Sequence, residues 1–204
     1  MRRPCTTSWS PFPPRTCEAQ FDEKWAFVAK KEAHCDPDNP ADDRRGDHRD
    51  HVALDPDHRL VVSVVTGKRT AENTGALVRD FHRRTSGRLM SLITTDEYAP
   101  YRGAILEAYG QTITPARSGK RGRPRKAYKV APAGLTYATV HKTRSKGRVV
   151  KVEQRIIFGT AGDVGAALAR SASSRAVNTS FVERQNGTDR NRNAWKARKS
   201  YCFS

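Results

Sequence analysis

The chain has 204 residues, enough for one domain with a packed core and a short arm. No run of 18 or more apolar residues occurs, so we expect no membrane-spanning helix. The polar, proline-interrupted residues 1–14 do not resemble a secretory signal. Because Cys5, Cys17, Cys35 and Cys202 form no C-x-x-C pair, a zinc ribbon and a disulfide framework are disfavoured, and a reducing cytoplasm is the simplest expectation.

The net charge of +17 is confined to one part of the chain. Residues 1–113 carry 17 Lys and Arg against 17 Asp and Glu, whereas residues 114–204 carry 21 against 4. A half-chain this basic predicts a polyanionic partner, most often nucleic acid. A ribosomal-type or architectural basic protein remains an alternative at this point.

The first half predicts strands and helices in alternation. Residues 1–17, with four prolines, predict a disordered arm. The aromatic-rich run 18–28 favours a strand, and the acidic stretch 30–50 favours a loop. Two further strands are predicted over 51–54 and 59–65, joined by a tight turn at 55–58. A helix over 73–84 capped by Thr70, a strand over 89–95 and a helix over 99–109 follow.

The second half predicts a basic loop at 117–129 and a hairpin of strands 136–143 and 148–158. A short helix over 163–170 and a long polar helix over 179–199, capped by Asn178, complete the chain. This order indicates an α/β fold with a mixed sheet flanked by helices, and it is the order of the ribonuclease H-like fold. We place the basic loop and the hairpin, about 114–160, as an insertion before the last helix.

Three carboxylates occupy positions that suit metal chemistry. Asp22 lies inside the first apolar strand, Asp96 directly follows the strand at 89–95, and Glu183 lies on the last helix. Together they can hold a divalent cation, and magnesium prefers such hard oxygen ligands. A structural role is the alternative, because Asp22 can pair with Lys24, Asp96 can cap a helix and Glu183 can be solvated.

Three sequence blocks carry a family resemblance. The stretch FVERQNGTDRNRN (181–193), followed by KSYCFS (199–204), resembles the last catalytic block of insertion-sequence-one family DDE transposases, which reads E-R-x-N, a basic run and C-F-S. The segments QFDEKWAFV (20–28) and LITTDEY (92–98) are similar to the two aspartate blocks of that family. The three blocks extend over about nine-tenths of the chain, from 20 to 204.

The resemblance implies a ribonuclease H-like catalytic domain over 18–204. Its triad of Asp22, Asp96 and Glu183 would bind Mg²⁺ or Mn²⁺, with two ions expected. Water would first free a 3′-hydroxyl at a transposon end, and that hydroxyl would then attack target DNA in line. The partners implied are double-stranded DNA and further copies of the chain in a homo-oligomer, in a bacterial cytoplasm. The chain has no G-x-x-x-x-G-K-[ST] loop, so no nucleotide cofactor is expected.

Basic residues near the triad are the expected DNA contacts. The family carries a basic residue about two helical turns after the glutamate, which Arg190 matches at i+7, with Arg192 as a rival. Arg184 directly follows Glu183. The loop at 120–126 contains the R-G-R-P core of an AT-hook, which predicts either minor-groove insertion or general phosphate contact. The DNA-binding residues expected in this loop are Arg121, Arg123, Arg125 and Lys126.

Family members carry an upstream DNA-binding module with cysteine pairs, which this sequence lacks, and they continue beyond C-F-S. We therefore expect a truncated copy. The alternative is a catalytically inactive DNA-binding remnant that inhibits intact transposase.

Overall fold

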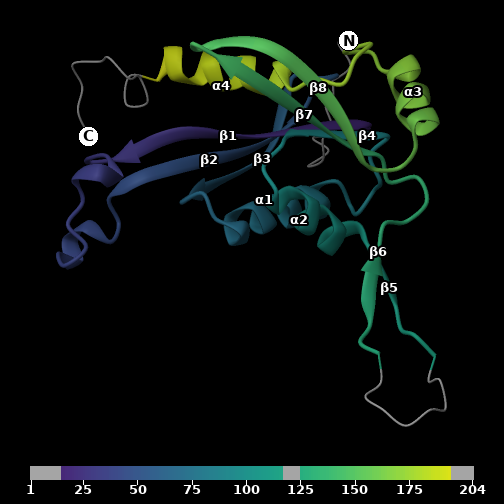
Figure 1. Ribbon diagram of the computed structural model, residues 1–204, viewed down its shortest axis with the longest axis horizontal. Coiled ribbons are helices and arrows are strands. Elements are labelled where there is room, and N and C mark those ends of the chain that lie inside the picture. Colours follow the sequence, from purple (N-terminus) through teal and green to yellow (C-terminus); the bar gives the residue numbers. More distant parts are fainter. Residues whose placement is uncertain (1–14, 117–124, 194–204) are drawn as a thin grey trace, which may run out of the picture.

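The computed structural model describes residues 15–116 and 125–193, and its centre is a mixed six-stranded sheet (Figure 1). The strand order is β3-β2-β1-β4-β7-β8. β1 pairs in parallel with β4 and β4 with β7, whereas the other neighbours are antiparallel. The six strands are β1 Glu18–Val28, β2 Gly46–Asp55, β3 Leu60–Gly67, β4 Leu92–Asp96, β7 Tyr137–Ser145 and β8 Arg148–Phe158.

Helices cover both faces of this sheet, so the chain is an α/β protein. The bounds are α1 Ala71–Arg84, α2 Pro100–Tyr109, α3 Ala161–Arg170 and α4 Ser180–Arg192. α1 and α2 pack on one face through the main core, in which Phe21, Phe81 and Ile105 are fully buried. α4 lies on the opposite face, where Val182 packs against β2 (Figure 1). Because side chains alternate along a strand, the residues of β1 on either side of Phe21 point toward α4.

Several predicted elements of the first half are confirmed. β1 has the predicted bounds, and the Thr70 side chain caps α1 by accepting the Asn73 N–H. The predicted loop at 30–50 is partly wrong, because β2 begins at Gly46 and its residues 46–50 pair with the end of β1. Residues 46–50 are mostly polar, so their composition did not indicate a strand. The rest of the stretch contains two 3₁₀ turns, Glu32–His34 and Pro40–Asp42.

The predicted hairpin at 136–158 forms, but it is not an insertion. β7 pairs with β4 and β8 pairs with β7, so both strands belong to the central sheet. The segment that leaves the body is instead the two-stranded arm of β5 Gln111–Ile113 and β6 Tyr128–Val130 (Figure 1). The part of the basic loop at 117–124 lies outside the described residues.

The last helix begins close to the predicted residue and ends earlier. Thr179 is the N-cap, and the side chain of Asn178 accepts the N–H of Ser180. The backbone of Asn193 is extended, so α4 ends at Arg192 rather than continuing to 199. Residues 1–14 of the predicted arm and 194–204 lie outside the described residues.

Within the described ranges, Cys17 and Cys35 are free thiols. No helix in those ranges is long and apolar enough to cross a membrane.

Candidate functional site

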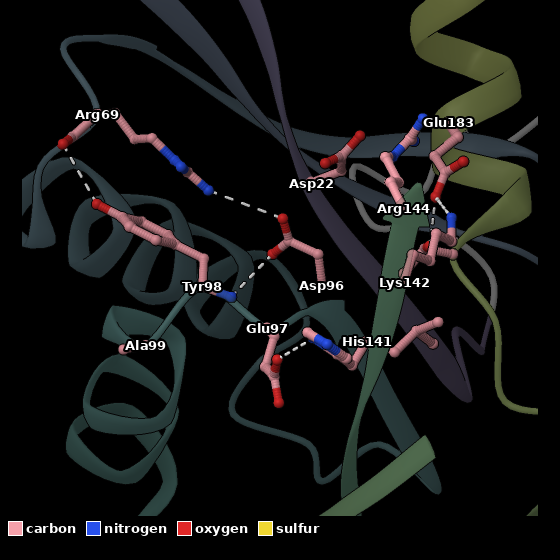
Figure 2. Close-up of a pocket in the computed structure, with 12 residues that line it drawn as sticks. Asp22, Arg69, Asp96, Glu97, Tyr98, Ala99, His141, Lys142, Arg144 and Glu183 are labelled. Carbon is pink, nitrogen blue, oxygen red and sulfur yellow. Dashed lines mark hydrogen bonds and ion pairs between the residues drawn. The ribbon is translucent and has the colours of Figure 1, made fainter. Parts of the chain in front are cut away.

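The three predicted carboxylates meet at one cavity on the α4 face of the sheet. Asp22 from β1, Asp96 from the end of β4 and Glu183 from α4 all line an open cavity of about 570 Å³ (Figure 2). The structure therefore brings together residues that are separated by up to 161 positions in the sequence.

Strand pairing explains why the two aspartates are neighbours. β1 and β4 run in parallel, and Phe21 pairs with Thr95. The next residue of each strand is the aspartate, and both side chains point to the face opposite the buried Phe21. The side chains of Asp22 and Asp96 consequently lie beside each other toward α4.

Gln20, which our sequence reasoning missed, anchors the start of α4 above these strands. Its side chain is 4% exposed, and its Oε1 accepts the backbone N–H groups of Phe181 and Val182 at 3.1 Å each. Its Nε2 donates to the carbonyl of Asn178 at 2.8 Å. These N–H groups belong to the first turn of a helix and have no partner within it, so Gln20 satisfies them. The helix start, and with it Glu183, is thereby held on β1.

Asn186 and Lys24 continue this contact along α4. Asn186 is 5% exposed and donates from Nδ2 to Oδ2 of Asp22 at 2.8 Å. Lys24 forms ion pairs with Asp189 and, at 3.1 Å, with Asp50. Lys24 therefore joins β1 to both β2 and α4. The signal for Asn186 was present in the sequence, because it is the N of E-R-x-N and lies one helical turn after Glu183.

The electrostatics of the cavity disfavour ionised aspartates. Burial raises the pKa of Asp22, and the negative charges of Asp96 and Glu183 raise it further, whereas the hydrogen bond from Asn186 lowers it. Partial burial also raises the pKa of Asp96, and the charges of Glu23 and Glu183 act in the same direction. A bound cation would relieve this repulsion.

Basic side chains already contact the outer two carboxylates. Arg69 Nη2 lies 3.8 Å from Asp96 Oδ2, and the Tyr98 N–H donates to the other carboxylate oxygen at 3.2 Å. Lys142 of β7 forms an ion pair with Glu183. Thr179 also donates to Glu183, at 2.5 Å. His141 and Arg144 add further basic groups to the cavity wall (Figure 2).

The donor set suits a hard divalent cation in kind, since three carboxylates on a polar cavity wall are oxygen ligands of the type that Mg²⁺ prefers. In residues 15–116 and 125–193, however, no group of three or more His, Cys, Asp or Glu side chains lies close enough to hold a metal ion. Glu183 is paired instead with the ammonium group of Lys142. Asp22 and Asp96 lie on neighbouring strands, so a shared metal site would need the Glu183 side chain to move closer to them.

The predicted DNA-binding residues are dispersed. Arg190 does not line the cavity and instead donates to the carbonyl of Trp25 at 3.4 Å. Arg184 lines a separate groove of about 220 Å³ with Arg59, whose guanidinium lies 3.6 Å from the centre of the Phe181 ring. Arg192 is exposed at the end of α4.

Of the residues predicted in the basic loop, two are described. Arg125 and Lys126 are exposed beside the β5–β6 arm, whereas Arg121 and Arg123 lie outside the described residues. Arg190, the arginine at i+7, lies outside the cavity wall, and its role in DNA binding stays a prediction.

No protein-family model matches the chain, and neither a curated protein nor a solved structure matches it at the significance applied.

Proposed function

We propose that this chain is the catalytic domain of a DDE-type DNA transposase, similar to the insertion-sequence-one family, that cleaves and joins phosphodiesters with a divalent metal. The observation that carries the proposal is the meeting of Asp22, Asp96 and Glu183 at one cavity. The proposed partners are double-stranded DNA and further copies of the chain.

The topology supports the proposal. A ribonuclease H-like sheet would have three antiparallel strands followed by two parallel strands, and the order β3-β2-β1-β4-β7 is compatible with that arrangement. In that fold the catalytic carboxylates lie on the first strand, at the end of the fourth and on the last helix. Asp22 on β1, Asp96 at the end of β4 and Glu183 on α4 would be the counterparts of these residues if the fold is of this kind.

The charges of the cavity support a phosphodiester substrate. Asp22, Asp96 and Glu183 would hold Mg²⁺ or Mn²⁺, which would supply Lewis acidity and offset the carboxylate charges that would otherwise repel a phosphate. Arg69, Lys142 and Arg144 line the same wall and can attract the phosphate oxygens. Asn186 orients Asp22 through its hydrogen bond, and Gln20 fixes the position of the helix that carries Glu183.

A second candidate is a DNA-binding remnant without catalytic activity. The observation that favours it is the contact of Lys142 and Thr179 with Glu183, which occupies the carboxylate that a metal ion would need. In this case the basic residues would still bind DNA.

The two candidates are separated by a strand-cleavage and strand-transfer assay with Mg²⁺ or Mn²⁺. We expect metal-dependent products from the wild-type chain, and a loss of about a thousandfold or more in D22N, D96N and E183Q with DNA binding retained. Glu72→Gln, at an exposed position of α1, is the matched control and should retain activity. DNA binding without any metal-dependent product would favour the remnant, and absence of DNA binding would refute both.

A further inference from the structure

The strand β8 is an exposed apolar edge of the sheet. It is the last strand in the order β3-β2-β1-β4-β7-β8, so within the described residues only β7 pairs with it. The exposed fraction of the side chain is 61% for Val150, 54% for Val152 and 42% for Ile156. Figure 1 shows β8 at the outer side of the sheet. An 11-residue edge strand with such side chains is a ready template for pairing with another strand.

The opposite edge strand, β3, also exposes apolar side chains, Leu60 at 40% and Val64 at 51%, but it differs from β8 in length and charge. β3 has eight residues, and Val62 and Ser63 in its middle are buried. Its sequence, LVVSVVTG, carries no charged residue. β8 instead places Glu153 between the cations Lys151 and Arg155. This pattern is self-complementary in an antiparallel arrangement, because a glutamate of one copy can face a cation of the other.

We propose that β8 pairs edge to edge with β8 of a second copy of this chain, as antiparallel strands related by a two-fold axis. The register that sets Gln154 opposite Gln154 of the second copy also sets Val152 opposite Ile156 and Glu153 opposite Arg155. Residues 151–156 pair with β7 without a register shift, so this central part of β8 is regular enough to extend the ladder. Apolar side chains thus meet apolar ones on one face, and opposite charges meet on the other.

This pairing has a geometric consequence for the cavity. When two identical strands pair as antiparallel neighbours in a continuous sheet, the two-fold axis is perpendicular to the sheet. Both copies then present the same face, so the two cavities beneath α4 open on one side of the dimer. The pairing of β8 does not depend on the proposed transposase activity. The tests of the pairing contain no DNA, so their failure is distinguishable from the failure of the proposed function.

The first test is sedimentation velocity over a range of protein concentrations. We expect a monomer–dimer equilibrium for the wild-type chain and a dissociation constant weakened at least tenfold by Val152→Lys combined with Ile156→Lys. Both positions are exposed in the monomer, so circular dichroism should show an unchanged fold. Val64→Lys on β3, at 51% exposure, is the matched control and should dimerise as the wild type does. A wild-type chain that stays monomeric, or a double variant that dimerises unchanged, would overturn the proposal.

The second test fixes the register by disulfide formation, in a background with the four native cysteines replaced by serine. Gln154→Cys should form a covalent dimer rapidly under mild oxidation, because each thiol faces its own copy across the two-fold axis. Val152→Cys should crosslink at least tenfold more slowly, because Ile156 stands opposite it. Faster crosslinking of Val152→Cys than of Gln154→Cys would overturn the register that we propose.

Discussion

Replacing Gln20 by methionine should detach the start of α4 from the sheet. The change keeps the approximate volume of the side chain but removes the acceptor of the Phe181 and Val182 N–H groups. A net hydrogen bond contributes about 1 kcal/mol, and each buried donor left without a partner costs roughly 1–3 kcal/mol. The carbonyl of Asn178 keeps a donor, because Thr94 also bonds to it at 3.1 Å. Because two donors lose their acceptor, we expect the free energy of unfolding to fall by about 2–6 kcal/mol.

Equilibrium urea unfolding measures this loss, and hydrogen exchange locates it. The amides of α4 should exchange faster in Q20M. Those of α1 should be unchanged, because α1 packs on the opposite face of the sheet, in the core that contains Phe21. Thr94→Val is the matched control: it is buried on the neighbouring strand and bonds to the same carbonyl, which Gln20 continues to satisfy. It should cost about 1 kcal/mol or less. A Q20M variant within about 0.5 kcal/mol of the wild type, with α4 equally protected, would refute this account of how Glu183 is positioned.

Three further predictions concern charge. Because burial raises the pKa of Asp22 above its ordinary value of 3.8, its ionisation costs folding free energy as the pH rises through the interval between the unfolded and folded pKa values. D22N should therefore be more stable than the wild type by roughly 1 kcal/mol at pH 7, and this gain should be absent below pH about 3. Urea unfolding at a series of pH values measures the gain. A gain that grows toward acid pH would show that folding lowers the pKa of Asp22 rather than raising it. Lys142→Met should release Glu183 and strengthen Mn²⁺ binding, measured by calorimetry, up to about fivefold. The free energy of unfolding should change little, because the ion pair is partly exposed. An unaltered affinity for Mn²⁺ would show that the ion pair does not compete with the cation. The basic loop contains Arg121, Arg123, Arg125 and Lys126. Neutralising all four should reduce the slope of log affinity for DNA against log salt concentration by roughly 3 to 4. An unchanged slope would exclude the loop from phosphate contact.

Local patterns predicted much of the fold. The alternation at 18–28 is a property of consecutive residues, and β1 has those bounds. The cap at Thr70 follows from a side chain bonding a backbone group three residues away, which is also local. The loop predicted at 30–50 was wrong where it met β2, because the polar residues at 46–50 form a strand only by pairing with β1. Such pairing depends on a partner that the local composition does not indicate.

The sequence by itself indicated the three carboxylates that line the cavity, and it determined the separation of a neutral part from a basic part of the chain. Only the tertiary structure decided that β7 and β8 complete the sheet. It also decided that Gln20 accepts hydrogen bonds from the start of α4 and that Lys142 forms an ion pair with Glu183. The bond between Gln20 and Val182 joins residues 162 positions apart. Contacts at that range arise from strand order and helix packing, which satisfy the backbone and bury apolar area over the whole chain at once. No window of the sequence contains both partners, so no local pattern can specify them.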